Sequence, residues 1–355
     1  MSYADMTYVS TSVLGYTLGT IKNTKLIHNK QYMSKIKSAM RFLKEDRGAF
    51  IAAIVQNFFR WLPDKPYLQL LYRFKMGHRL DLKNPKTFTE KLQWLKLYNR
   101  KPEYTLMVDK YAVKKYVADI IGEKYIIPTL GVWDEPEDID WDALPNQFVL
   151  KTTHGGGGGG VVICKDKHTF NRTEAIAKLN QSMRSDIYNG LREWPYKNVP
   201  RRIIAETFMA PEKGQTDLII NGIIEHPLKG DEGLNDYKLF CFNGKVKFFK
   251  VDFGRFVEHH ANYYSPEGML LEFGEKDFKP VPDYPIELPV NLNAMIALAE
   301  KLATNIPFLR VDFYNINGKI YFGELTFYPA SGLSHLTPEE WDKKLGCFLQ
   351  LPSTL

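Results

Sequence analysis

The stretch that decides the fold is FVLKTTHGGGGGGVVICKD, residues 148–166, in which six consecutive glycines separate two runs of strand-like residues. A flexible linker usually mixes glycine with Ser, Thr or Pro and joins separate domains. Here each flanking run is too short to be a domain, and each alternates like a strand. The glycines are therefore predicted to form the oversized tip of a β-hairpin.

Glycine-rich loops also bind phosphate. A P-loop needs Gly-Lys-Ser/Thr before a helix, and a dinucleotide fingerprint needs a helix that begins at its third glycine. The run VVICKD, residues 161–166, is too short and too β-branched for either. Two interpretations stay open: a structural hairpin, or a loop whose bare amides contact anionic oxygens beside Lys151.

A second informative stretch is FLRVDFYNINGKIYFGELTF, residues 308–327. Arg310 and Asp312 share one face of a predicted strand, and Glu324 lies on the return strand. Mg²⁺ prefers hard oxygen ligands, and a guanidinium neutralises phosphate oxygens, so this set suits divalent-metal chelation of a polyphosphate. The alternative is an exposed hairpin with ordinary surface charges.

The register of this hairpin tests the metal hypothesis. A two-residue turn at Asn317 and Gly318 would pair Asp312 with Gly323 and send Glu324 to the opposite face. If both acids share a metal ion, the hairpin must contain a longer loop or a β-bulge. We predict that it does.

The remaining pattern predicts an α+β protein with a mostly helical N-terminal region. An amphipathic helix is expected from Arg47 to Leu62, stopped by Pro63. Thr87 and Glu90 form a capping-box pair. Three further helices are expected over residues 65–77, 87–100 and 103–122. Short strands in antiparallel hairpins follow, interrupted by two clear helices, Thr173–Ser185 and Leu292–Ala303.

Composition narrows the class of protein. A chain of 355 residues with 44% hydrophobic content can bury a large core and divide into two or three lobes. Its three scattered cysteines argue against a disulfide framework or a cysteine metal site. We recognise no secretory signal, and the longest apolar run, residues 49–62, is too short and polar to span a membrane. A cytoplasmic protein is therefore expected.

The net charge of +6 suits a polyanionic substrate, a phosphate-bearing cofactor or an anionic membrane surface. No zinc-finger spacing, ribonucleoprotein signature or helix-turn-helix punctuation is present, so nucleic acid is not an expected partner. The helix from Arg47 to Leu62 is either a core helix or one that lies in a membrane interface. Peripheral contact at the inner face of the membrane stays open.

Taken together, these segments resemble the ATP-grasp superfamily, in which two α+β subdomains grip ATP. VDKYAVKKYV is similar to the helix with the superfamily's first phosphate-contacting lysine, which matches Lys110. Lys151 matches the second lysine, before the glycine lid. IIAETFM is similar to the hinge strand, whose glutamate near adenine and ribose matches Glu206.

The C-terminal half continues the resemblance. NDYKLFCFNGKVKFFKVDFGR resembles a strand pair of the peptide-ligase branch, with Lys238 where an arginine often stands and Arg255 as a substrate or phosphate contact. LRVDFY and GELTF match the segments that supply an arginine, Arg310, and two metal carboxylates, Asp312 and Glu324. One departure is Thr326, which replaces a usual asparagine ligand; a hydroxyl is the poorer Mg²⁺ ligand.

The finer resemblance is to the TupA-like ATP-grasp family, from about Pro66 onward, through NPKTFTEKLQWLKLYNR, LKTTHGGG and GELTFYPASG. That family is associated with teichuronopeptide and other surface-polysaccharide biosynthesis. The resemblance implies a carboxylate-amine ligase that joins an amino acid or peptide to a uronic-acid-bearing capsular or cell-surface glycan or its precursor. It also implies four parts: a helical region over 1–105, subdomains over 106–205 and 206–345, and a tail over 346–355.

The same resemblance implies a mechanism. ATP and Mg²⁺ are expected between the subdomains, and the γ-phosphoryl passes to a carboxylate, giving an acyl phosphate that an amine attacks. Arg310 would neutralise developing charge, and Arg255 or Lys238 would hold the acceptor carboxylate. The residues expected to bind the nucleotide are Lys110, Lys151, His154, Gly156, Gly157, Gly158 and Glu206, and those expected to bind the metal are Asp312 and Glu324.

Several other sequence features have more than one interpretation. His154 is a phosphate contact or a structural residue, and His259 and His260 are interpreted as surface or substrate-side histidines, because strand neighbours face opposite ways. A glycosyltransferase would use Asp138 and Asp140 as an Asp-x-Asp motif, although this segment reads as an acidic helical turn after Pro136. A non-catalytic nucleotide-binding scaffold would be favoured by loss of the metal acids, and both are present.

Overall fold

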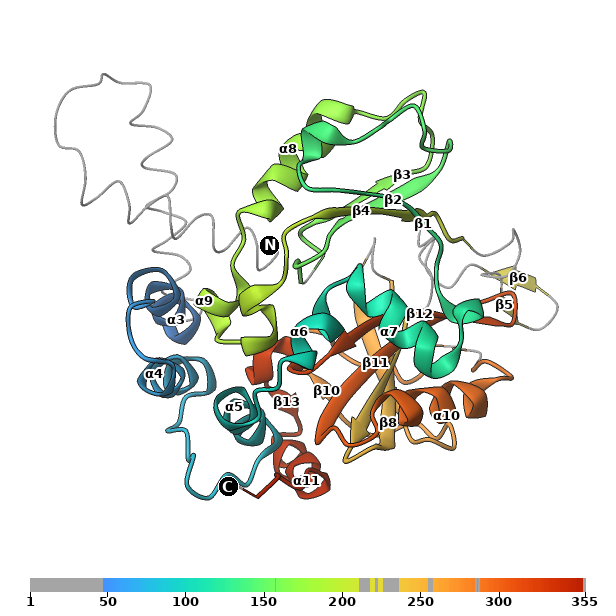
Figure 1. Ribbon diagram of the computed structural model, residues 1–355. Helices are drawn as coiled ribbons and strands as arrows, with labels where there is room; N and C mark the ends of the chain where they lie inside the picture. The colour runs from blue at the N-terminus through green and yellow to red at the C-terminus, as the bar shows by residue number, and fades with distance from the viewer. Residues whose placement is uncertain are drawn as a thin grey trace, which may run out of the picture. The chain divides into compact units, whose positions relative to one another are not determined.

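The computed structural model describes residues 47–156, 158–210, 218–220, 223–225, 236–254, 258–284, 286 and 288–353 (Figure 1). The chain divides into two compact units. One comprises residues up to Lys83 together with Tyr188–Arg192, and the other comprises Asn84–Ile187 and Glu193–Leu355. Gly157 and Arg255, both named above as candidates, lie outside the described residues. The four-part division expected from the sequence stays a prediction.

The first unit contains α3 (Arg47–Phe58), α4 (Asp64–Met76) and most of the short α9 (Ile187–Leu191). Its centre is the buried Arg192, which forms an ion pair with Asp64 at 3.1 Å and lies over the ring of Tyr67. Arg192 also donates to the backbone oxygens of Arg60 and Leu62. These carbonyls turn toward the guanidinium, which accounts for α3 ending before Leu62, where the sequence pattern had extended it.

In the second unit, a four-stranded antiparallel sheet has the order β1-β4-β2-β3. Its strands are β1 (Thr129–Trp133), β2 (Phe148–Thr152), β3 (Val161–Cys164) and β4 (Ile203–Thr207). Helix α8 (Arg172–Met183) packs on β2 and β3, burying Leu179 against Phe148 and Leu150. β2 pairs with β3 from Phe148 opposite Cys164 to Lys151 opposite Val161, so the predicted glycine-tipped hairpin is confirmed.

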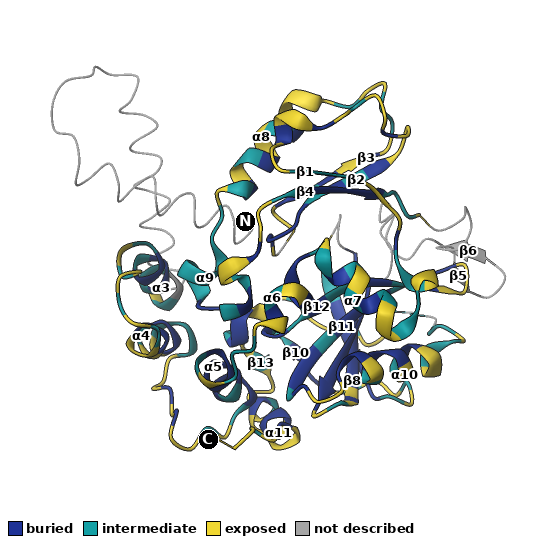
Figure 2. Ribbon diagram, in the orientation of Figure 1, coloured by how far each residue is buried: buried dark blue, intermediate teal, exposed yellow. Residues whose placement is uncertain are grey.

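A five-stranded antiparallel sheet has the order β12-β11-β7-β8-β9. Its strands are β7 (Asp236–Phe242), β8 (Lys245–Phe253), β9 (His260–Tyr264), β11 (Phe308–Ile316) and β12 (Lys319–Thr326). Helix α10 (Leu292–Leu302) packs on one face, where the Cys241 thiol contacts the backbone oxygen of Ala299. The opposite face is aromatic at one end of the strands, where Phe88 packs on Phe242 and Phe308. Figure 2 shows that these strands are largely buried, whereas α8 and α10 each expose one side.

The β11–β12 hairpin contains the predicted bulge. Ile316 pairs with Lys319 across a two-residue turn whose residues, Asn317 and Gly318, have φ of 52° and 72°. Farther along, Phe313 pairs with Phe322 but Asp312 pairs with Glu324, which leaves Gly323 as the extra residue. The bulge returns Glu324 to the face of Asp312. The register required for a shared metal ion is therefore present.

The single helix expected over residues 103–122 is wrong, because the structure has two: α6 (Glu103–Val108) and α7 (Ala112–Ile121). Asp109 is extended between them, with ψ of 113°. Its side chain accepts hydrogen bonds from the backbone N–H groups of Tyr111 and Ala112, which caps α7. Gly122 ends α7 as expected, with φ of 112°.

The other elements are mostly short. The expected capping box of Thr87 and Glu90 opens α5 (Phe88–Tyr98). Strands β9, β10 (Gly274–Glu275) and β13 (Leu336–Thr337) and helix α11 (Glu340–Phe348) were not expected from the sequence pattern. The remaining pieces are β5 (Leu218–Ile220), β6 (Ile223–Glu225), η1 (Glu123–Tyr125), η2 (Pro136–Asp138), η3 (Trp194–Asn198) and η4 (Pro329–Gly332). None of the helices described is both long enough and apolar enough to cross a membrane.

Candidate active site

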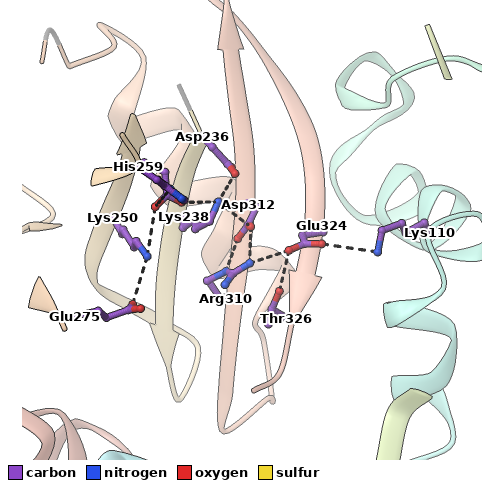
Figure 3. Close-up of polar contacts among 11 residues, drawn as sticks. Lys110, Asp236, Lys238, Lys250, His259, Glu275, Arg310, Asp312, Glu324 and Thr326 are labelled. Atoms are coloured by element: carbon purple, nitrogen blue, oxygen red, sulfur yellow. Dashed lines mark hydrogen bonds and ion pairs between the residues drawn. The ribbon is translucent and has the colours of Figure 1, made fainter. Parts of the chain in front are cut away.

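A stripe of polar side chains crosses the five-stranded sheet on the face opposite α10. Register pairs its members in order across all five strands: Glu324, Asp312, Lys238, Lys250 and Tyr263. Directly paired residues of antiparallel strands point to the same face, so these side chains are neighbours. Asp236 and Asp252 also pair directly, on the same face and two residues along β7 and β8 from Lys238 and Lys250. Figure 3 shows Glu324, Asp312, Lys238 and Lys250 of this stripe, with Lys110 approaching Glu324 from the helical side.

At the β11–β12 end, Arg310 joins the two proposed metal ligands. It donates to Asp312 through Nε at 2.7 Å and through a terminal nitrogen at 2.6 Å, and the same terminal nitrogen donates to Glu324 at 2.8 Å. Burial raises the pKa of Asp312 to about 6, although Arg310 and Lys238 oppose this. For Glu324, Lys110 and Arg310 outweigh burial and lower the pKa to about 2. The Thr326 hydroxyl donates to Glu324 at 3.3 Å.

These acids suit a magnesium ion that is shared with phosphate oxygens. Asp312 and Glu324 offer hard oxygen ligands from directly paired positions. Among the described residues, no group of three or more His, Cys, Asp or Glu side chains could hold a metal ion. Mg²⁺ is commonly bound through one or two carboxylates plus substrate phosphates and water, so two acids are sufficient.

Lys238 lies in the middle of the stripe and is enclosed by three carboxylates. It contacts Asp236, Asp252 at 3.0 Å and Asp312 at 3.5 Å. Although burial opposes the charge, these acids raise the pKa of Lys238. The residue expected to hold a substrate carboxylate is thus engaged by three protein carboxylates from three strands.

Lys110 contacts both the glycine hairpin and Glu324 on β12. Its backbone N–H donates to the Thr153 carbonyl at 3.0 Å, and its Nζ donates to the Gly155 carbonyl at 2.5 Å. The same Nζ lies 3.9 Å from Glu324. Burial lowers the pKa of Lys110, although Glu324 opposes this. The lysine therefore reaches the space that a triphosphate between the hairpin and the acids would occupy.

Lys151 and Glu206 form a second charged group, together with a lysine that the sequence analysis missed. The Glu206 carboxylate contacts Lys151 and Lys114 at 2.5 Å each. Burial opposes ionisation of Glu206, but the two lysines outweigh it and lower its pKa. Lys114 follows Lys110 by four residues in a stretch whose pattern predicts a single helix, and that spacing could have indicated it.

The glycine hairpin is packed closely at its base. A Cβ at Gly155 would lie 2.5 Å from the Thr152 hydroxyl, and one at Gly160 would lie 2.1 Å from it. Gly158 has φ of 77°, whereas a Cβ at Gly156 would meet only Ile187. His154 is buried, and within the described part of the chain neither ring nitrogen has a hydrogen-bond partner. Burial and Arg201 lower the pKa of His154.

Of the other singled-out residues, Asp138, Asp140 and His260 do not join this site, whereas His259 lies against Asp252 beside the polar stripe. Asp138 ends η2, and Asp140 accepts hydrogen bonds from the backbone of Asp142 and Ala143, so the acidic helical turn is confirmed. His260 contacts the Lys279 carbonyl at 3.0 Å, and His259 contacts Asp252 at 3.2 Å.

The aromatic end of the same sheet face is closed. A cavity of only about 30 Å³ remains where α5 and the segment after β12 cover it. Its lining includes Phe88, Phe240, Phe248, Tyr263 and Glu275. That volume holds about one water molecule. Among the described residues, the aromatic end of this face therefore offers no room for a substrate, and the polar stripe is its more open part.

Comparison with known proteins identifies the family. Residues 90–350 match the family described as TupA-like ATPgrasp, and a search of curated proteins finds no match. This match spans well over half of the chain, so the chain belongs to the TupA-like ATP-grasp family. It is an ATP-dependent ligase with an ATP-grasp fold.

Solved structures similar to this chain include three ATP-grasp proteins. D-alanine-D-alanine ligase from Helicobacter pylori is 16% identical over 75% of this chain and 70% of its own, with a TM-score of 0.39. A RimK domain ATP-grasp protein from Sphaerobacter thermophilus is 14% identical over 72% of each chain, with a TM-score of 0.36. L-amino acid ligase from Bacillus licheniformis is 15% identical over 82% of this chain and 58% of its own, with a TM-score of 0.37.

Proposed function

We propose that this chain is a carboxylate-amine ligase that joins an amino acid or peptide to a uronic-acid-bearing capsular or cell-surface polysaccharide or its precursor. The observation that carries the ligase chemistry is the direct pairing of Asp312 with Glu324 across the bulged hairpin, beside Arg310 and within reach of Lys110. The glycan acceptor is supported by the family alone.

The triphosphate of ATP lies between the glycine hairpin and the polar stripe. Lys110 and Lys151 bind its oxygens, together with His154 and the backbone amides of Gly156 and Gly158. Glu206 lies near the adenine and ribose of the bound nucleotide, after the nucleotide has replaced Glu206 as the partner of Lys114 and Lys151. Support comes from the short distances of Lys110 to Gly155 and of Lys151 to Glu206. Asp312 and Glu324 would hold magnesium, which supplies charge neutralisation on the phosphate oxygens.

The γ-phosphoryl passes to the substrate carboxylate, and the resulting acyl phosphate is attacked by the amine. Arg310 stabilises the negative charge that develops on the phosphoryl and on the tetrahedral carbon. Arg255 or Lys238 holds the acceptor carboxylate. No side-chain nucleophile is needed, and the glycine hairpin excludes the water that would hydrolyse the acyl phosphate.

Peripheral membrane contact belongs to the same proposal. It is supported by the net charge of +6 and by the exposed Trp61 and Phe58 at the end of α3. Flotation with anionic vesicles tests it, and full-length protein that stays at the bottom of the gradient would remove it.

The ligase proposal is tested by calorimetric binding of ATP and of UDP-sugars, each with Mg²⁺. We expect Lys151→Ala and Glu324→Ala each to weaken ATP binding about 10- to 100-fold, because each removes a charged contact of about 1.5–3 kcal/mol. Lys245→Ala is the matched control, since Lys245 is exposed on β8 and pairs with Glu300. Binding of a UDP-sugar with no response to ATP would sink the ligase and favour a glycosyltransferase.

A further inference from the structure

The far end of the polar stripe, on β8 and β9, contains an imidazole-carboxylate pair that the proposed function has not used. His259 Nε2 lies 3.2 Å from Asp252 Oδ1, with the His259 side chain 31% exposed and the Asp252 side chain 2% exposed. Asp252 also contacts Lys238 at 3.0 Å and Lys250 at 3.3 Å. The carboxylate is therefore fixed from several sides, and the imidazole is the accessible member of the pair.

The pairing defines the tautomer of the imidazole. With its proton on Nε2, the ring donates to Asp252, and Nδ1 keeps a free lone pair. Within the described residues, Nδ1 has no hydrogen-bond partner. The ring packs on Phe278, whose centroid lies 4.4 Å away. Asp252 thus orients a ring that presents one basic nitrogen.

This nitrogen lies on the substrate side of the phosphate-binding groups. Asp252 is on β8, two strands from Asp312 on β11. Neighbouring strands are about 4.8 Å apart, so the pair lies about 10 Å across the sheet from Asp312, the nearer of the two proposed metal ligands. That is the span of one small substrate. A carboxylate activated beside Arg310 and an amine beside His259 would meet over Lys238.

The proposed reaction requires a base at this end, because an ammonium ion has no lone pair. The other groups of the stripe serve poorly. Lys238 is held by three carboxylates, and Tyr263 donates to Glu275 at 2.6 Å while burial raises its pKa well above the usual value. Glu275 is engaged by Lys250 and Tyr263, which lower its pKa against the effect of burial. Asp236 contacts Lys238, and Lys250 contacts Asp252 and Glu275, so both are engaged by neighbouring charges. The His259 imidazole, by contrast, presents a nitrogen with no hydrogen-bond partner among the described residues.

We propose that His259 is the general base for the amine substrate, a catalytic residue that Asp252 positions; this inference rests on the proposed ligase function. Nδ1 takes one proton from the bound ammonium group. The free amine then attacks the acyl carbon, the new C–N bond forms, and the C–O bond to phosphate breaks. A second proton passes from the nitrogen to the departing phosphate, and imidazolium returns its proton to solvent.

The test compares two nucleophiles. Hydroxylamine is already unprotonated at neutral pH and traps acyl phosphates as hydroxamates, whereas an amino acid arrives as ammonium. Full-length wild type, His259→Gln and His260→Gln are supplied with ATP, Mg²⁺ and free uronic acids, with hydroxylamine or with the common amino acids. Glutamine can still donate to Asp252 but cannot act as a base. His260 is the matched control, because it bonds the Lys279 carbonyl instead of Asp252.

We expect His259→Gln to lose about 100-fold or more of amide formation with amino acids while it keeps hydroxamate formation within about threefold of wild type. His260→Gln should keep both. Equal losses with both nucleophiles, or no loss with either, would overturn the role of His259. If wild type itself forms no hydroxamate from any uronic acid, the proposed function fails, and this inference fails with it.

Discussion

Asp109 illustrates how one side chain can position Lys110, a residue proposed to bind phosphate, without itself contacting substrate. One carboxylate oxygen caps α7 through Tyr111 and Ala112, and the other accepts from Arg202 at 2.7 Å. The next residue in the chain is Lys110, whose backbone N–H donates a hydrogen bond to the carbonyl of Thr153 on the glycine hairpin. Asp109 therefore fixes the point from which the Lys110 side chain reaches toward Glu324.

Removing this carboxylate should affect both stability and nucleotide binding. We expect Asp109→Ala to lower the free energy of unfolding by about 2–4 kcal/mol, because a helix cap is lost and Arg202 loses a buried partner. ATP should also bind more weakly. Chemical denaturation and calorimetry measure the two effects.

The matched control is Asp119→Ala on the same helix. Asp119 pairs with Lys115 one turn earlier, and both side chains are largely exposed. Such a pair contributes only about 0.3–0.5 kcal/mol. If both substitutions had the same small effect, Asp109 would not be positioning Lys110.

Sequence motifs pointed to the residues that the structure places at one end of the stripe, whereas at the other end His259 was noted only as a surface or substrate-side residue and Asp252 was missed. Lys110, Arg310, Asp312 and Glu324 stand in short stretches whose spacing is informative by itself. Asp252 gains its meaning from the register of β8 against its neighbours, which sets what it faces across the sheet. That register depends on long-range pairing, which spacing along one chain does not record.

At the scale of elements, the two decisive hairpins were predictable because each contains its own turn and its own alternation. The bulge of β11–β12 followed from requiring Asp312 and Glu324 on one face, and Gly323 supplies it. The break between α6 and α7 was missed, because the pattern of apolar residues continues through Asp109. Strands β10 and β13 have two residues each, too few for any periodicity.

The glycine hairpin makes a prediction about its individual glycines. A Cβ at Gly160 would lie 2.1 Å from the Thr152 hydroxyl and 2.3 Å from the Ser182 hydroxyl, whereas one at Gly159 would meet nothing within 4 Å. We expect Gly160→Ala to cost about 1–3 kcal/mol of unfolding free energy through overpacking and to weaken ATP binding. Gly159→Ala should stay within about 0.5 kcal/mol of wild type.

Denaturant unfolding and ATP calorimetry on the two variants measure this difference. Thr152 and Ser182 share a hydrogen bond of 2.8 Å, so neither hydroxyl can turn away without losing its partner. Equal behaviour of Gly159→Ala and Gly160→Ala would contradict the idea that close packing makes glycine necessary at position 160 and not at position 159.

At the scale of the molecule, the helix α5 is built into the ligase unit. The family match begins at residue 90, inside α5, and the compact unit begins at Asn84. From α5, Lys96 donates to the backbone oxygen of Ser331 at 2.8 Å and to its hydroxyl at 2.6 Å. These bonds hold η4 directly after β12, where Ala330, Ser331 and Gly332 all have positive φ.

A fully buried lysine that holds a strained turn gives the whole molecule a pH-dependent stability. Burial lowers the pKa of Lys96 from 10.5 to about 8, and the charge of Glu193 opposes the shift only in part. Between these pH values the unfolded chain binds more protons at this site than the folded chain does, so the free energy of unfolding rises with pH.

The rise attributable to Lys96 should reach about 3 kcal/mol across that window, because each pH unit corresponds to about 1.4 kcal/mol. Chemical denaturation of wild type and of Lys96→Met at several pH values isolates the contribution of Lys96 to the free energy of unfolding. The other groups that titrate at alkaline pH are present in both proteins. Lys96→Met should be the less stable protein, because the donors to Ser331 are lost, and the gap should widen as pH rises. Parallel curves would mean that Lys96 has the same pKa in the folded and the unfolded chain, and this source of pH dependence would then be ruled out.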